Sequence, residues 1–188
     1  MKRAGPSDFS ERSLKELLDD VAARTPAPGG GSSAATATAL AAALVEMAAN
    51  FSKDLAPEFE RAGNLRTRAL ELAETELHAY EPVLEALRLP REDPERAARV
   101  SAAQTEASKS PLEVARVAAD LAELAAELAT NGNPNLTGDA IAGALLAEAA
   151  AQAASRLVAI NLTDGPVVEE AADHAGRARA ARERALAA

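Results

Sequence analysis

Apolar residues recur along most of the chain at the three- and four-residue spacing of an amphipathic α-helix, and clusters of proline and glycine interrupt this pattern. No stretch of the sequence shows the alternating β-branched pattern that is typical of a strand. The pattern predicts an all-α protein, a bundle of about five to seven long helices, some of them kinked. We expect one domain over residues 1–188, because two halves of this length would each bury only a marginal core.

Capping residues and helix breakers set the expected boundaries. In chain order, the expected helices cover roughly residues 13–24, 32–53, 57–87, 93–131, 139–162 and 167–188. A Ser-x-x-Glu capping box starts the first at Ser13, and Ser32 or Ser33 caps the second. Pro82 predicts a kink near residues 78–82 of the third helix, since proline removes a backbone donor from the helix interior.

Two proline-containing starts divide the fourth stretch. Asp93 precedes Pro94, and Ser110 precedes Pro111, so that each pair fits an N-cap followed by proline at the first helical position. The stretch therefore forms either one kinked helix or two. Asn131 and the glycine after it end it.

Composition adds a close-packed interior and an acidic surface to this picture. Hydrophobic residues make up 48% of the chain but aromatic residues only 2%, so Ala, Leu and Val must fill the core and the helices can approach closely. The net charge of −9 and the pI near 4.8 disfavour nucleic acid and anionic membranes as partners. Gly143, in the alanine-rich helix expected over residues 139–162, fits the same close packing.

The cellular setting follows from residues that the sequence lacks. It has no cysteine, which removes disulfides, thiolate nucleophiles and cysteine metal sites and is compatible with a reducing compartment. The first thirteen residues contain no apolar signal segment, and Glu46 interrupts the most apolar run. We therefore expect a soluble, cytoplasmic protein that does not enter a membrane.

The segment TPAPGGGSSAATATALAAAL, which starts at Thr25, places three glycines directly before a helix that is apolar nearly all round. A glycine triplet can serve as a linker, as a helix stop, or as a loop whose backbone amides approach a ligand. The sequence pattern alone leaves these three alternatives open. The third draws on the unpaired amides and the dipole at a helix N-terminus.

The segment ELAETELHAYEP concentrates titratable side chains before Pro82. On one helix, Glu74 shares a face with His78, and Glu76 shares another with Tyr80. These residues could form an acid–base site, or Glu74 and His78 could form an exposed ion pair while Tyr80 packs. Two histidines without a His-x-x-x-His pair make a metal site a poor expectation.

Other polar residues gather in the loop NGNPNLTGD and at the end of the helix that follows it. Asn135, Asp139 and Asn161 belong to this group. Their local pattern fits ordinary caps and breakers as well as it fits a binding site.

Taken in order, these motifs resemble the cyclodeaminase/cyclohydrolase family of tetrahydrofolate enzymes. The resemblance spans nearly the whole chain and rests on the glycine-serine element, RLP at residues 88–90, SPLEVA at 110–115, NPNLTGDAIAGALLA at 133–147 and INL at 160–162. It implies an all-helical homodimer that pairs through its helices and binds a folate one-carbon substrate, with no metal and no permanently bound cofactor.

The resemblance also implies the site residues. The family's Asp-x-Asp motif falls on Glu74 and Glu76, so both carboxylates are retained on side chains one methylene longer. Glu76 is the implied acid/base, Glu74 is second to it, and His78 is an assisting group. The residues implied for substrate binding are Gly29, Gly30, Gly31, Ser32, Asn135, Asp139 and Asn161.

The function that follows is that of a methenyltetrahydrofolate cyclohydrolase. The first alternative is a formiminotetrahydrofolate cyclodeaminase that releases ammonia, and the second is a non-catalytic helical dimer that keeps the pocket. The substrate's glutamate carboxylates would need a local cation, for which Lys53, Arg88 and Lys109 are the candidates.

Overall fold

The computed structural model describes residues 9–52 and 55–188, which form helices and no strand. In chain order the elements are η1 (Phe9–Glu11), α1 (Leu14–Val21), α2 (Gly30–Asn50), α3 (Ala56–Glu76), α4 (Glu81–Leu87), α5 (Arg96–Ala107), α6 (Lys109–Asn131), η2 (Pro134–Leu136), α7 (Thr137–Asn161) and α8 (Pro166–Leu186). Six of the described helices have twelve or more residues. The expected all-α bundle is confirmed.

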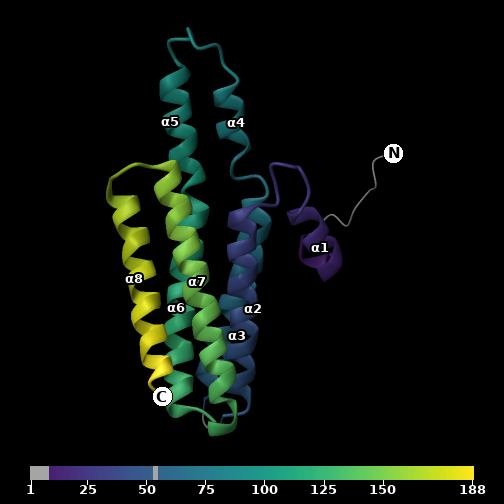
Figure 1. The fold of residues 1–188 in the computed structure, drawn as a ribbon, viewed down its shortest axis with the longest axis vertical. Helices are drawn as coiled ribbons and strands as arrows, with labels where there is room; N and C mark the ends of the chain where they lie inside the picture. Colours follow the sequence, from purple (N-terminus) through teal and green to yellow (C-terminus); the bar gives the residue numbers. More distant parts are fainter. Residues whose placement is uncertain (1–8, 53–54) are drawn as a thin grey trace.

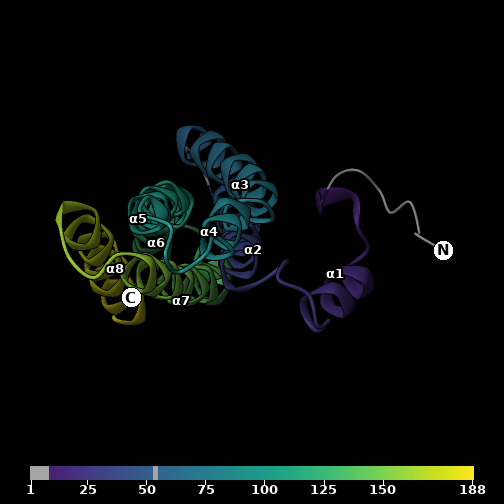
Figure 2. The same ribbon diagram turned by 90° about the horizontal axis from the view of Figure 1, so that it is seen from above.

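Helix α6 is the centre of the bundle and packs against α2, α3, α7 and α8 (Figures 1 and 2). Its Leu121 and Leu124 are among the largest fully buried side chains, and alanines fill most of the remaining core. Small side chains allow backbones to approach. At Gly143 of α7, an added Cβ would lie 2.8 Å from Val45 Cγ2 of α2, so this glycine permits the observed spacing of the two helices.

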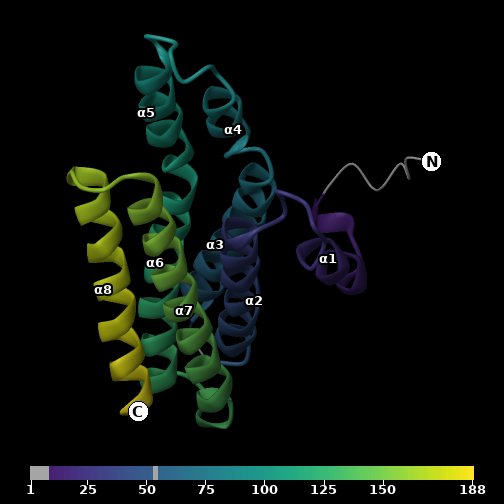
Figure 3. The ribbon, with the colours of Figure 1, turned by 45° about the horizontal axis from the view of Figure 1, so that its top comes forward.

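Two parts of the chain extend beyond the bundle (Figures 1 and 3). Helices α4 and α5 pair with each other and project from one end of it. Helix α1 stands to one side, and none of its residues is buried. Its predicted capping box is confirmed, because the Ser13 side chain accepts the Glu16 N–H and the Glu16 side chain accepts the Ser13 N–H.

The third expected helix is divided rather than kinked. Helix α3 ends at Glu76, and α4 begins at Glu81. In the turn between them the N–H groups of Leu77 and His78 bond three residues back, to the carbonyls of Glu74 and Thr75. This tightening ends α3 and leaves Pro82 in the first turn of α4, where its missing N–H costs little.

Helix starts also differ from the expected ones. Helix α2 begins at Gly30 with Gly29 as its N-cap, so Ser32 and Ser33 lie inside its first turn. Asp93 is not the N-cap of α5, because this helix begins at Arg96 with Glu95 as its N-cap. Asp93 Oδ1 accepts the Glu95 N–H at 2.8 Å in the turn before it.

The fourth stretch consists of two helices separated at Ser108. Helix α6 already begins at Lys109, so Ser110 and Pro111 are buried in its first turn and are not a cap and a first helical residue.

Candidate active site

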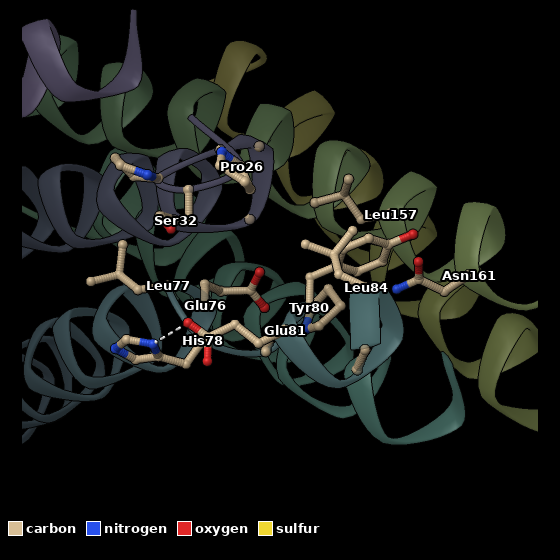
Figure 4. A pocket seen from close by; sticks show the side chains of 18 of the residues that line it. Pro26, Ser32, Glu76, Leu77, His78, Tyr80, Glu81, Leu84, Leu157 and Asn161 are labelled. Atoms are coloured by element: carbon tan, nitrogen blue, oxygen red, sulfur yellow. Dashed lines mark hydrogen bonds and ion pairs between the residues drawn. The ribbon is translucent and has the colours of Figure 1, made fainter. Parts of the chain in front are cut away.

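A cavity of about 680 Å³ opens at the end of the bundle where α2 begins (Figure 4). The loop before α2, the end of α3, the turn to α4, α4 itself and the end of α7 all line it. Its volume lies within the range of small-molecule sites. Several segments that are far apart in the sequence therefore converge on one hollow of suitable size.

The Glu76 carboxylate lies directly against the first turn of α2. A Cβ added to Gly31 would overlap Glu76 Oε2 and would lie 3.2 Å from Glu76 Cγ. No residue but glycine can therefore stand at position 31 without moving this carboxylate. The glycine triplet provides close backbone approach to a side chain at the end of α3, which excludes the linker role for Gly31.

The same helix terminus brings backbone donors to the cavity. Gly29, Gly30, Gly31 and Ser32 all line it. The first residues of a helix have no carbonyl one turn back, so their N–H groups and the helix dipole favour an anion or a carbonyl oxygen. The first backbone bond at this end joins the Ser33 N–H to the Gly29 carbonyl at 3.0 Å. The start of α2 and the Glu76 carboxylate therefore lie at the same cavity, and ligand binding by these backbone amides stays a prediction.

Burial perturbs this carboxyl group. Removal from water raises the pKa of Glu76, and the nearby Ser110 hydroxyl lowers it by a smaller amount. Glu76 Oε1, Ser110 Oγ and Ser32 Oγ are buried and complete no hydrogen bond with the described residues. Buried polar atoms are nearly always paired, so the unpaired oxygens of Glu76 and Ser32, both of which line the cavity, indicate a place where a polar ligand binds.

His78, Tyr80 and Asn161 also line the cavity. His78 Nδ1 lies 2.9 Å from Glu81 Oε1, and its side chain is 69% exposed (Figure 4). The alternative pairing of His78 with Glu74 does not occur, because α3 ends between them. Asn161 closes the far side at the last residue of α7.

Glu74 is absent from the lining of this cavity. Its Oε2 accepts the backbone N–H of Phe9 at 2.6 Å, in the segment before α1. The two carboxylates that share the sequence motif therefore serve different places, since residues two apart on a helix point about 200° apart. The expected pair of catalytic carboxylates does not meet around one cavity.

Asn135 and Asp139 also lie away from the cavity. They flank the start of α7, whereas Asn161 is its last residue (Figure 1). Twenty-two residues of helix separate Asp139 from Asn161, which corresponds to about 33 Å. Within one chain the structure does not bring these two residues to the loop before α2.

Two residues at this site, Arg12 and Ser110, were not predicted from the sequence as site residues. Arg12 lines the cavity although no motif marks it. Tyr80 also lines it, whereas the alternative interpretation of the sequence gave this side chain a packing role. Ser110 lies beneath Glu76, and its serine-proline pattern suggested a helix cap. The signal that could have singled out Ser110 is its place in a motif shared with known enzymes.

The three cations predicted to bind the substrate's carboxylates differ in their positions relative to the cavity. Arg88 lines the cavity, whereas Lys109 Nζ pairs with Glu106 Oε2 at 2.6 Å. Lys53 lies outside the described residues. Among residues 9–52 and 55–188, no three His, Asp or Glu side chains are grouped so as to hold a metal ion.

Comparison with known proteins identifies the family. The family model described as formiminotransferase-cyclodeaminase matches residues 13–180. The chain belongs to this family. The matched region includes the glycine-serine loop and Glu76, which line the cavity.

Individual relatives cover most of the chain. A methenyltetrahydrofolate cyclohydrolase of Methylorubrum extorquens is 32% identical over 84% of each chain. A formimidoyltransferase-cyclodeaminase of Mus musculus is 32% identical over 86% of this chain, which spans 32% of the mouse protein. The solved formiminotetrahydrofolate cyclodeaminase of Thermotoga maritima has a TM-score of 0.85 at 31% identity, with 96% of each chain covered.

Proposed function

We propose that this member of the formiminotransferase-cyclodeaminase family is an enzyme of tetrahydrofolate one-carbon chemistry and acts as a methenyltetrahydrofolate cyclohydrolase. The observation that carries the proposal is the partly buried carboxyl of Glu76, held against Gly31 at a helix N-terminus inside a cavity. The similarity to the Methylorubrum enzyme over 84% of both chains favours this reaction. We treat residues 1–188 as one domain of this type.

The chemistry calls for one group that first accepts and then donates a proton. Water adds to the electrophilic methenyl carbon, and a base must remove a proton from that water. A ring C–N bond then opens, and an acid must protonate the departing nitrogen. Glu76 performs both steps in turn, because its raised pKa brings the acid and base forms closer in free energy near neutral pH.

The remaining lining residues bind and orient. The amides of the first turn of α2 face a carbonyl or anionic part of the substrate. Asn161 offers both an amide donor and a carbonyl acceptor to the edge of a pterin. His78, already bonded to Glu81 at the rim, assists proton transfer from an exposed position. The reaction as proposed uses no metal and no permanently bound cofactor.

Two alternatives have support of their own. The similarity to the Thermotoga cyclodeaminase over 96% of both chains favours attack by a folate nitrogen on a formimino carbon with loss of ammonia. The same carboxyl would serve, since one nitrogen loses a proton and another gains one. A non-catalytic dimer is the second alternative, because each glutamate is a methylene longer than the aspartate of the family motif, and such displacement can cost about a hundredfold in rate.

Assays of the two substrates decide among these three functions. Purified protein is incubated with methenyltetrahydrofolate, whose absorbance falls on hydrolysis, and separately with formiminotetrahydrofolate, from which released ammonia is measured. We expect hydrolysis above the buffer rate and little ammonia. Ammonia release at the higher kcat/KM would assign the cyclodeaminase reaction instead. A rate no higher than that of buffer with both substrates would leave only the non-catalytic dimer.

The proposal includes a homodimer that pairs through helices. Helix α2 and its C-cap carry Leu40, Met47 and Phe51 at exposed positions, and Leu40 and Phe51 are 58% and 65% exposed. The helix has only one charged residue, Glu46, and this residue bonds to Arg66. An exposed apolar stripe on an otherwise uncharged helix favours burial against another copy. Antiparallel pairing would also bring the partner's start of α7, with its Asn135 and Asp139, toward this cavity.

Leu40→Glu is expected to convert the dimer to monomer, because a charge placed in an apolar interface must be desolvated without a partner. Sedimentation equilibrium measures the change. Ala153→Glu, at an exposed position of α7, is the control for adding a charge to a helix surface. A wild-type chain that sediments as a monomer would contradict the proposed dimer.

We place the enzyme in the cytoplasm. Two of the described segments, Gly30–Asn50 and Pro134–Asn161, are long and apolar enough to cross a membrane by length and composition. Both pack within the bundle, where α2 and α7 contact each other and α6. Core helices of soluble proteins pass the same test, so these segments fit the bundle without a membrane.

A further inference from the structure

The hydrogen bond between Glu74 and Phe9 ties the start of the described chain to the bundle. Glu74 Oε2 accepts the Phe9 N–H at 2.6 Å across 65 residues of sequence. A bond from a backbone amide to a carboxylate is stronger than one between neutral groups. Phe9 is 5% exposed and packs in a core cluster that includes Leu72 and Ala73 of α3. One polar and one apolar contact thus fix the same residue.

Fixing Phe9 also fixes Arg12. The Arg12 N–H lies 3.4 Å from the Phe9 carbonyl, and its guanidinium carbon lies 5.4 Å from the centre of the Phe9 ring. Arg12 Nη1 bonds to Asp20 Oδ2 at 2.7 Å, while other guanidinium donors stay available. The side chain is 23% exposed and lines the cavity. Glu74 therefore holds the segment that delivers a cation to the cavity that Glu76 occupies.

The charges around the cavity show what this cation can do. Arg12 and Arg88 are the arginines of its lining, and they come from the segment before α1 and from the end of α4. Within the described chain, Arg88 makes no ion pair or side-chain hydrogen bond. The chain as a whole carries a net charge of −9, which repels anions at long range. A substrate that bears carboxylates therefore depends on these two side chains.

We propose that Arg12, together with Arg88, binds the carboxylates of a substrate's glutamate tail, and that Glu74 is a positioning residue that acts through Phe9. The inference rests on the proposed function, since a folate substrate carries an α- and a γ-carboxylate at the end away from its reacting carbon. A guanidinium offers paired donors to a carboxylate in matching geometry. Glu74 and Glu76 thus have different roles. Glu74 holds Arg12 in position through Phe9, and Glu76 is the acid/base at the reacting carbon.

Arg12→Gln tests recognition with two substrates, methenyltetrahydrofolate and methenyltetrahydropteroate, which lacks the glutamate. We expect kcat/KM to fall by about 10- to 100-fold for the glutamate-bearing substrate, through KM, as for loss of a charge-assisted bond. The rate with the pteroate substrate should stay within about twofold. Lys15→Gln, which removes an exposed α1 cation paired with Asp19, is the control and should change neither rate. An equal loss with both substrates would overturn the recognition role.

Glu74 is tested by comparing alanine with glutamine. The carboxamide oxygen of Glu74→Gln can still accept the Phe9 N–H, so this variant should keep wild-type selectivity. Glu74→Ala should show the same selective loss as Arg12→Gln, together with faster tryptic cleavage after Arg12. A large fall of kcat in Glu74→Gln with both substrates would show that the carboxylate takes part in the reaction and would overturn the positioning role.

A failure of the proposed function remains distinguishable from a failure of this inference. If the wild-type protein turns over neither substrate, equilibrium dialysis with tetrahydrofolate and tetrahydropteroate replaces the rates. Tighter binding of the glutamate-bearing compound that disappears in Arg12→Gln would support the recognition role without catalysis. Equal binding of both compounds by the wild-type protein would overturn it.

Discussion

Glu76→Gln is expected to lower kcat on methenyltetrahydrofolate by a factor on the order of 10²–10⁴, the usual contribution of a positioned acid or base. The substitution keeps the size of the side chain beside Gly31 and removes its negative charge and its ability to exchange a proton. Stopped-flow absorbance measures the rate. In the wild-type protein, kcat/KM should rise with pH through a pKa above the ordinary glutamate value, because burial raises the pKa of Glu76. That limb should be missing in the variant.

The Tm of Glu76→Gln distinguishes a loss of catalysis from a loss of folding. A carboxyl whose folded-state pKa is raised stabilises the fold fully below its unfolded pKa and loses this contribution as pH rises through the folded pKa. The charged form of Glu76 therefore destabilises the fold as pH rises through its folded-state pKa, and Glu76→Gln should raise Tm above that pH, with a change on the order of 2–4 °C for each kcal/mol. The difference should shrink below about pH 4.5, the ordinary range of a glutamate pKa.

The matched control for Glu76 is Glu71→Gln on the same helix. Glu71 is exposed, pairs with Arg68 and does not line the main cavity. Its replacement should leave kcat and its pH dependence unchanged. If Glu76→Gln retained the wild-type rate, another group would have to move the proton, and the acid/base role of Glu76 would be withdrawn.

Gly31→Ala is expected to lower kcat/KM by about 100-fold or more, although it adds only one methyl group. The new Cβ would occupy the position of Glu76 Oε2, so the carboxylate must move. Displacement by about 1 Å is enough for a loss of this size. Steady-state kinetics measures the effect. Combined with Glu76→Gln, Gly31→Ala should add much less than the sum of the two losses, because both act through one carboxylate.

Gly176→Ala in α8 is the control for adding a methyl group to a helix. A Cβ at Gly176 would meet nothing within 4 Å. We expect unchanged activity and a gain in stability of about 0.5–1 kcal/mol, since alanine is the better helix former. A Gly31→Ala variant that is folded and as active as the wild type would show that Glu76 can be relocated without loss, against the proposed geometry.

Much of the fold was accessible from sequence because helix formation here is local. The periodic apolar pattern predicted the long helices, and the capping box at Ser13 was confirmed. Boundaries near proline and serine were less accessible. Ser110 and Pro111 carry a helix-start pattern, but both are buried within the first turn of α6, where packing outweighs a capping preference. The break between Glu76 and Glu81 was predicted only as a kink.

The candidate site was predicted in part. Glu76, His78, Asn161 and the glycine-serine loop do line one cavity. Glu74, Asn135 and Asp139 were predicted from motifs of the same family resemblance. The Glu74 side chain points away from the cavity to the Phe9 N–H, and Asn135 and Asp139 lie at the other end of α7 from Asn161. Arg12 had no sequence signal, because its place depends on Phe9 packing against α3.

By itself the sequence determined the helices, their alanine-rich packing, the acidic surface and the membership of a family, since these follow from local spacing and ordered motifs. Only the tertiary structure decided which of two neighbouring carboxylates faces the cavity, because residues two apart on a helix point in nearly opposite directions. The tertiary structure also explains why position 31 requires a glycine. The contact that requires it joins α2 to the end of α3, 45 residues away, and no local pattern records such a contact.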